Sequence, residues 1–272
     1  MSLAWITHAV DGGFLLLTDA QRAEYLTMEP QGEKYIRRYV GARELLHNIK
    51  RWCFWLEDAD PSEFRRLPLL RERIAKVRAF RLASSDAGTR RQAETPHLFR
   101  TPTMQPASNY LAVPSVTSET RKYIPLAFCE ASEIANNRLH ILENASLYHF
   151  GVLHSAMHMA WTRQVCGRMR FDFLYSSDLA YNTLAWAEAP RPQDVQAISD
   201  AAQAVLKIRE RYPNASLADL YDPLAMPKDL LNAHKRLDRA VDRCYRRERF
   251  ATDLERLRFL FERYTELTAS EA

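Results

Sequence analysis

The segment RMRFDFLY (168–175) has polar residue types that can read base pairs. Its apolar and polar residues alternate, which predicts a half-buried strand with Arg170 and Asp172 on one face. Arginine donates to guanine O6 and N7, and an aspartate accepts from cytosine N4, so the two side chains together can read one G·C pair. Arg168 shares that face and can hold a phosphate. The alternative is a surface ion pair between Arg170 and Asp172, which stabilises little.

A second polar group lies earlier in the chain. Ser118, Arg121 and Lys122 can hold phosphate groups. Asn137 and Arg138 open a later strand-like run, and asparagine with adenine and arginine with guanine are favourable base contacts. The alternative for both groups is turn chemistry with solvated side chains.

Positive charge is concentrated in one part of the sequence. The formal charge of the chain is +4, whereas residues 37–100 alone carry fifteen basic and eight acidic side chains. A cationic stretch of this kind suits a polyanionic partner, and we expect Arg78 and Arg81 to contact phosphates. The alternative is a solvated basic helix face.

Several chemistries have no support in the sequence. The seven glycines show no spacing typical of nucleotide-binding loops. No Gly-x-Ser-x-Gly motif or [Asp/Asn]-Pro-Pro-[Tyr/Phe] motif occurs, so neither a hydrolase nucleophile nor an amino-methylation site is indicated, and we predict no catalytic residue. His154 and His158 have metal-ligand spacing on a predicted helix, but no Glu accompanies them, so packed core histidines are favoured over a metal site.

The cysteines and hydropathy point to a reducing, non-membrane setting. Cys53, Cys129, Cys166 and Cys244 lie far apart without a Cys-x-x-Cys motif, which favours buried free thiols. No apolar run is long enough for a membrane span, and no signal peptide is recognised at the start. We therefore expect a cytoplasmic location and no membrane partner.

The periodicity before residue 190 predicts a mixture of helices and strands. Helical spacing covers Lys34–Ile49 and Leu67–Phe80, and residues 83–109 read as a long loop. Strand-like runs follow at Tyr110–Val113, Lys122–Phe128 and Arg138–Leu142. Leu147–Cys166 then reads as one apolar helix, with Gly167 at its C′ position.

Beyond Pro190 the composition changes, and the pattern of apolar residues predicts helices. Three helices are predicted, at Asp194–Arg211, Lys228–Arg247 and Arg249–Leu267, with a loop-like link at 216–227. The predicted fold class is therefore α+β, with a mixed α/β domain at 1–190 and an α-helical domain at 191–272.

Several segments resemble the C-terminal half of MmeI-like DNA methyltransferases, many of which are fused restriction–modification enzymes. They run in the family's order from about residue 10 to about residue 268. The matching stretches are RWCFWL (51–56), TSETRKYIP (117–125), LYHFGVLHSAMHMAW (147–161), GRMRFDFLYS (167–176), AYNTLAW (180–186) and LADLYDPLAMPKDLLNAHKRLDRAVD (217–242). The sequence departs from the family at Leu184-Ala185, where a Phe-Pro pair is usual.

The resemblance implies a DNA target recognition domain followed by a helical C-terminal domain. In the family, the strand matching GRMRFDFLYS carries base-reading positions, which favours Arg170 and Asp172 for direct readout. The implied function is sequence recognition for an S-adenosylmethionine-dependent DNA adenine-N6 methyltransferase. Double-stranded DNA and the catalytic domain of the same protein would be the partners, and the cofactor would be held by that domain, outside this chain.

Two other interpretations remain open from the residues. One is a non-catalytic module that docks protein subunits, which an exposed apolar patch on a neutral surface would favour. The other is a metal enzyme built on His154 and His158, which would require a bound metal ion.

Overall fold

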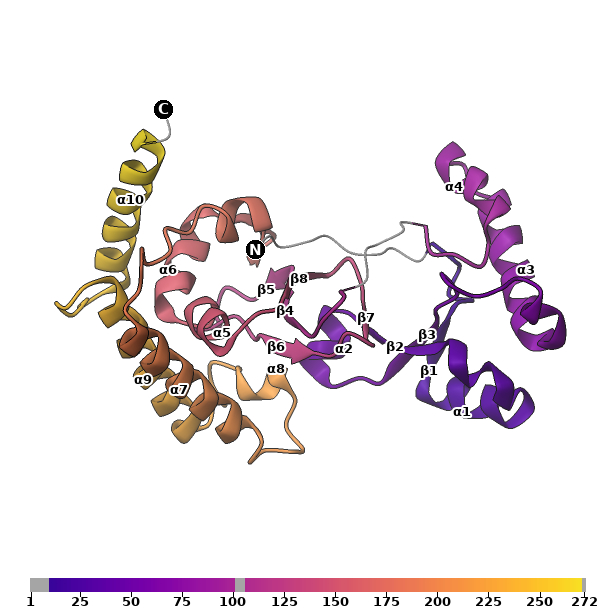
Figure 1. The fold of residues 1–272 in the computed structure, drawn as a ribbon, viewed down its shortest axis with the longest axis horizontal. Coiled ribbons are helices and arrows are strands. Elements are labelled where there is room, and N and C mark those ends of the chain that lie inside the picture. The colour runs from indigo at the N-terminus through magenta and orange to yellow at the C-terminus, as the bar shows by residue number, and fades with distance from the viewer. Residues whose placement is uncertain (1–9, 101–105, 271–272) are drawn as a thin grey trace. The chain divides into compact units, whose positions relative to one another are not determined.

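The computed structural model of the chain describes residues 10–100 and 106–270 (Figure 1). Helices and mixed sheets occur together, with helices alone toward the C-terminus, which confirms the α+β class. The described residues form two compact units. The N-terminal unit comprises those of 5–107 together with 130–139, and the C-terminal unit comprises 108–129 together with those of 140–272.

The N-terminal unit is built on a mixed sheet. Its strands are ordered β1-β3-β2-β7, and the last pair, β2 and β7, is parallel. This pairing is what joins residues 130–139 to the unit. Buried Cys53, Phe54, Leu70 and Val77 belong to its core. The elements are β1 (Leu16–Thr18), α1 (Asp19–Met28), β2 (Ile36–Val40), α2 (Ala42–His47), β3 (Arg51–Phe54), α3 (Pro68–Leu82), α4 (Ala87–Arg91) and β7 (Ile134–Ala135).

The C-terminal unit combines two small sheets with a helical layer around one core. The sheets are ordered β6-β4-β8 and β5-β10-β9. Helices α5 and α7 approach closely at Gly151, where a Cβ atom would lie 2.5 Å from Ile198 Cγ2. The strands are β4 (Tyr110–Pro114), β5 (Val116–Thr117), β6 (Ala127–Cys129), β8 (Leu139–Glu143), β9 (Gly167–Met169) and β10 (Asp172–Leu174). The helices are α5 (Leu147–Leu153), α6 (Ala156–Val165), α7 (Pro192–Arg209), α8 (Leu217–Leu220), α9 (Lys228–Tyr245) and α10 (Asp253–Ser270).

Two predictions in the N-terminal half are wrong. The segment 34–49 is not one helix, because a 3₁₀ turn (Pro30–Tyr35), strand β2 and helix α2 divide it. Tertiary pairing of β2 with β3 overrides its helical spacing. The predicted loop 83–109 contains α4, whose first turn is capped by Asp86 accepting from Thr89 N at 2.7 Å. Residues 101–105 of that loop lie outside the described residues.

The apolar stretch after β8 also differs from its prediction. Leu147–Cys166 forms two helices, because the chain leaves helical geometry at His154 and Ser155 caps the start of α6. Gly167 begins strand β9 instead of occupying a helix C′ position. The segment 216–227 contains the short helix α8.

The helices beyond residue 190 do not form a separate core. Buried Ile198, Leu237 and Leu260 belong to the same cluster as Phe150 of α5. The boundary near residue 190 therefore stays a prediction from composition. Among the described residues, no helix is both long and apolar enough to cross a membrane.

Candidate nucleic-acid interface

The segment 168–175 is a tight hairpin, so the prediction of one continuous strand is wrong. Strands β9 and β10 pair antiparallel with Met169 opposite Asp172, which leaves Arg170 and Phe171 as a two-residue loop. The alternating pattern runs through the reversal without a Gly or Asn to mark it, which is why periodicity missed the turn. Arg170 therefore lies at the hairpin tip, two residues before Asp172 but not on one strand face with it.

Arg170 has a backbone conformation that arginine rarely adopts. Its φ of +60° lies in the left-handed region, at the first loop position where type II′ hairpins usually have glycine. A side chain there costs on the order of 1–2 kcal/mol. Strain of this kind is found mainly at functional sites, so the arginine side chain is a candidate for a functional group.

Arg168 braces the hairpin. Its Nη1 donates to the carbonyl of Phe171 at 2.9 Å and pairs with Glu119 at 3.2 Å. The guanidinium also lies 3.9 Å from the ring centroid of Phe173. These contacts hold the tip in a fixed shape, while the Arg168 side chain stays 46% exposed.

The hairpin exposes apolar side chains of this segment, although its alternation predicts a half-buried strand. Phe173 is buried, but Phe171 at the tip is 75% exposed and Met169 beside it is 46% exposed. Leu174 is also exposed. An exposed aromatic ring at a rigid loop tip is typical of a surface that meets a partner.

The second polar group of the C-terminal unit lies beside this hairpin. Strand β5 pairs with β10, and residues 118–122 follow β5 directly. Burial lowers the pKa of Arg121, and the negative charges of Asp172 and Asp222 partly offset that shift. Lys122 is exposed, and the Ser118 hydroxyl lies 3.0 Å from that of Thr120. The fold thus brings Ser118, Arg121 and Lys122 to the hairpin.

Arg170 and Asp172 do not form the surface pair that their spacing allowed. In the described parts of the chain, no ion pair joins these two side chains. Asp172 instead lies close enough to Arg121 to affect its pKa. The Arg170 guanidinium is exposed at the tip.

Asn137 and Arg138 belong to the other unit. They follow β7 in a turn in which Arg138 N donates to Asn136 Oδ1 at 2.9 Å. Arg138 is exposed and Asn137 is half-buried. They occupy a turn and do not begin a strand, since β8 begins at Leu139.

The two arginines predicted on the basic helix have opposite environments. Arg78 is exposed on α3 and lines a hollow of about 340 Å³ together with Arg65 and Arg71, over an apolar floor that includes Phe64. Arg81 is completely buried. Its guanidinium donates to the carbonyls of Val10, Gln92, Thr95 and Leu98 at 2.7–3.0 Å. The prediction that Arg81 contacts phosphate is therefore wrong, because the side chain is used inside the N-terminal unit.

His154 and His158 are buried core residues with different neighbours. Arg209 Nη2 lies 3.2 Å from His154 Nε2, whereas His158 Nε2 lies 3.0 Å from the Tyr175 hydroxyl. Burial lowers the pKa of both imidazoles, that of His158 to about 3. Among the residues with described side chains, no cluster of three or more His, Cys, Asp or Glu side chains could hold a metal ion.

The C-terminal unit thus presents a hairpin with an exposed arginine at its tip, beside the cationic loop at 118–122, on an α+β scaffold. The family model described as MmeI, target recognition domain, matches residues 3–188. The model described as MmeI, C-terminal domain, matches residues 190–271. The chain belongs to the MmeI family, of which it carries these two domains.

Two relatives show how much of a longer protein the chain represents. DNA methyltransferase A of Bacillus subtilis (strain 168) is 36% identical over 258 residues, which is 95% of this chain and 29% of that protein. The Type IIL restriction-modification enzyme MmeI, solved in complex with DNA, has a TM-score of 0.93 at 43% identity. That match covers 98% of this chain and 36% of the enzyme. The chain therefore spans about a third of the length of these relatives.

Proposed function

We propose that this chain is the DNA sequence recognition region of a cytoplasmic, S-adenosylmethionine-dependent DNA adenine-N6 methyltransferase of the restriction–modification kind. The observation that carries the proposal is the strained hairpin, which exposes Arg170 at its tip in a chain of the MmeI target recognition family. The resemblance to MmeI, which was solved with DNA, supports duplex DNA as the partner.

In this proposal the hairpin reads bases. Arg170 donates to guanine O6 and N7 in the major groove, and Asp172 accepts from the amino group of the paired cytosine. A good contact of this type discriminates against a wrong base by about 1–3 kcal/mol. Asn137 and Arg138 form a second base-reading group on the other unit.

Backbone contacts would set the register of the protein on the duplex. Arg78 on α3 and the Ser118, Arg121 and Lys122 group contact phosphates. Arg168 can add a phosphate contact through its exposed part while it braces the tip. These contacts are independent of sequence and make the affinity depend on salt.

Methyl transfer itself belongs to a separate catalytic domain of the same protein. The sequence has neither a glycine-rich loop for the methyl donor nor an [Asp/Asn]-Pro-Pro-aromatic motif for the target amine. We therefore assign the S-adenosylmethionine site to that domain and propose that this chain does not catalyse by itself.

Exchanging Arg170 and Asp172 in the full-length enzyme tests the base-reading role. Aspartate tolerates the left-handed region better than most residues, so the exchange is compatible with the hairpin. Mapping of methylated sites is expected to show a changed base pair at one position with methylation retained. The control Lys122→Gln is expected to weaken binding to all sequences alike and leave the site unchanged. An unchanged recognition site in the exchange variant would falsify the readout role.

A protein-docking module is the second candidate function. The exposed apolar group of Phe171, Met169 and Leu174 favours it. In that case Phe171→Ser would abolish association with a purified partner domain and leave the affinity for duplex DNA unchanged. The DNA-reading proposal expects the Phe171→Ser variant to keep that association.

A further inference from the structure

Helix α9 has exposed cations on one face and buried apolar side chains on the opposite face. Its exposed cationic side chains are separated by intervals of seven, one, three and four residues, which place them on one side of a helix. We call this group the α9 stripe. It consists of Lys228, Lys235, Arg236, Arg239 and Arg243. The opposite face buries Leu230, Leu237 and Val241 in the core.

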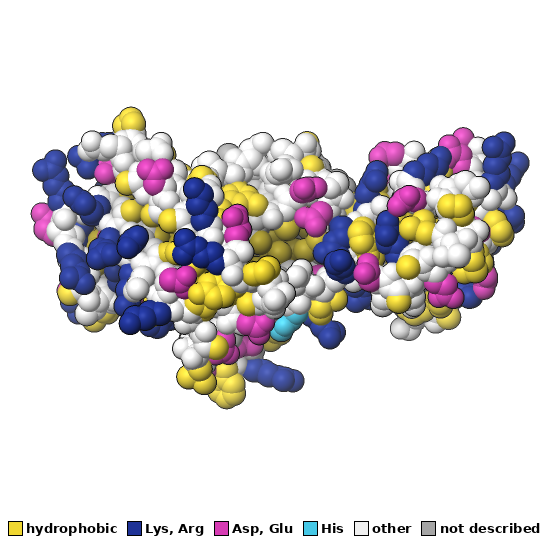
Figure 2. Space-filling model, turned by 90° about the horizontal axis from the view of Figure 1, so that it is seen from below, with side chains coloured by type: hydrophobic (Ala, Val, Ile, Leu, Met, Phe, Trp, Pro, Cys, Tyr) yellow, Lys and Arg dark blue, Asp and Glu magenta, His cyan; other side chains and the backbone are white. Residues whose placement is uncertain are grey.

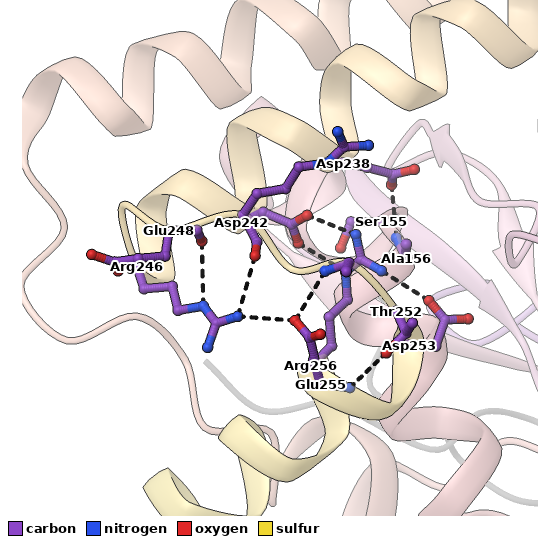
Figure 3. A network of polar contacts seen from close by, with 12 residues as sticks. Ser155, Ala156, Asp238, Asp242, Arg246, Glu248, Thr252, Asp253, Glu255 and Arg256 are labelled. Atoms are coloured by element: carbon purple, nitrogen blue, oxygen red, sulfur yellow. Dashed lines mark hydrogen bonds and ion pairs between the residues drawn. The ribbon is translucent and has the colours of Figure 1, made fainter.

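The three acidic side chains of α9 all accept hydrogen bonds from residues outside the helix. Asp229 accepts from the Tyr212 hydroxyl at 2.8 Å. Asp238 accepts from Ala156 N at 2.8 Å and from the Tyr123 hydroxyl, and Asp242 binds Arg256 through both oxygens at 2.9 and 2.7 Å (Figure 3). None of these hydrogen bonds involves a stripe residue, and the charge of Asp242 is balanced by Arg256.

The stripe cations are not paired with acids, in contrast to their neighbours. Within the described side chains, none of the five lies within 4.0 Å of a carboxylate oxygen. Nearby arginines such as Arg246, Arg256 and Arg263 do have acidic partners. The pKa of Asp194 is lowered first by its hydrogen bond from Arg191, at 2.7 Å, and to a smaller degree by the charge of Arg243. The stripe is thus a line of cations that have no ion-pair partner among the described side chains.

The stripe is long enough to face several phosphates of a DNA duplex. From Lys228 to Arg243 the helix rises about 22 Å at 1.5 Å per residue. A duplex carries one negative charge per roughly 1.7 Å of its axis, so that length opposes many phosphates. Figure 2 shows Lys and Arg side chains gathered, at the left, over the region of α7, α9 and α10.

We propose that the α9 stripe binds the phosphate backbone of duplex DNA as a surface additional to the base-reading hairpin. This rests on the proposed function, because it takes DNA as the partner. Composition favours DNA over a protein surface. The cores of protein interfaces contain aromatic and other apolar side chains besides arginine, whereas the stripe contains only cations.

The test compares two charge-matched variants of the full-length protein. Lys235→Gln/Arg239→Gln removes two stripe cations, and Lys207→Gln/Arg258→Gln removes two exposed cations of α7 and α10. The affinity for a duplex that contains the recognition site is measured by fluorescence anisotropy over a range of salt concentrations. Thermal unfolding of both variants is recorded alongside, and midpoints equal to that of the wild type show that the fold is kept.

Each phosphate contact contributes about 0.9 to the slope of log K against log salt, so the stripe variant is expected to lose about 2 from that slope. The control is expected to keep it. A wild-type slope in the stripe variant would overturn the stripe proposal and leave the proposed function standing, whereas a wild-type protein that binds no duplex would overturn both.

Discussion

Arg78 and Arg81 lie about one helical turn apart on α3, and burial gives them different roles. Arg78 is exposed beside other arginines, so its charge is available to a partner. The buried Arg81 guanidinium ties the end of α3 to residues before β1 and after α4 through backbone carbonyls. A buried charge that loses its hydrogen bonds is costly, so Arg81 is a structural residue.

We therefore expect substitution of Arg81 to affect stability and substitution of Arg78 to affect DNA binding. Arg81→Met leaves several carbonyls without donors and is expected to lower the free energy of unfolding by about 3 kcal/mol or more. Arg78→Ala is expected to change it by less than about 0.5 kcal/mol while weakening binding to all DNA sequences alike. Urea unfolding and duplex binding of both variants measure the difference. Equal stability losses would contradict the assignment.

Arg170 offers a second contrast, between stability and recognition. Glycine accepts a φ of +60° freely, so Arg170→Gly is expected to raise the free energy of unfolding by about 1 kcal/mol. The same variant is expected to lose discrimination at one base pair, on the order of 10- to 100-fold.

Ala189→Gly is the matched control, because Ala189 also has a positive φ, of +42°, but lies outside the hairpin. It is expected to gain stability and keep full discrimination. Chemical unfolding and competition binding with single-base variants of the site measure both properties. A stabilised Arg170→Gly protein with unchanged discrimination would show that Arg170 does not read DNA.

At the scale of elements, the break between α5 and α6 decides the role of the histidines. A continuous helix would place His154 and His158 on one face, whereas the break gives each its own partners. His154 contacts Arg209 of α7 and packs against the ring of His234 of α9 at 4.7 Å. His158 reaches the Tyr175 hydroxyl just after β10. The two imidazoles thus join helices and strand within one core.

Burial of these imidazoles predicts a loss of stability in acid. Because the pKa of folded His158 is lowered to about 3, the folded state stays neutral while the unfolded state takes up a proton below about pH 6.5. Stability contributed by this group is therefore lost progressively as the pH falls from about 6.5 toward 3. One such proton corresponds to about 1.4 kcal/mol per pH unit.

His158→Gln is expected to reduce that slope by about 1.4 kcal/mol per pH unit between pH 6 and 4. Tyr175→Phe is the control, since it removes the hydrogen bond and keeps the titrating group. Denaturant unfolding at several pH values measures the slopes. Asp238, whose pKa burial raises to about 6, acts in the opposite direction in all three proteins and cancels in the comparison. Parallel pH curves for His158→Gln and wild type would contradict the assignment.

At the scale of the whole molecule, the number of basic residues in a segment does not tell how many of them are exposed and unpaired. Residues 37–100 have the largest excess of basic side chains, but Arg81 among them is used internally. Residues 191–272 carry fifteen basic and fourteen acidic side chains, and yet α9 presents an unpaired cationic line. The difference arises because folding turns the α9 acids toward hydrogen-bond donors and leaves its cations in solvent.

Local patterns predicted the regular parts of the fold. The apolar periodicities of α3, α7, α9 and α10 and the strand character of β4 and β8 all appear close to their predicted ranges. These segments are consistent at the level of propensity and pattern, so no distant partner changes them. The segment 34–49 and the helix break at His154 depend instead on pairing with β3 and on a serine cap, which periodicity does not record.

The sequence by itself determined the α+β class, the family resemblance, and the residue types that can read DNA. Only the tertiary structure decided which of those residues reach a partner. It reversed the chain at Arg170 and Phe171, buried Arg81, and exposed the α9 stripe. The physical reason is that burial, turn geometry and charge neutralisation depend on groups far away in sequence, such as the carbonyl of Val10 for Arg81 and Arg256 for Asp242.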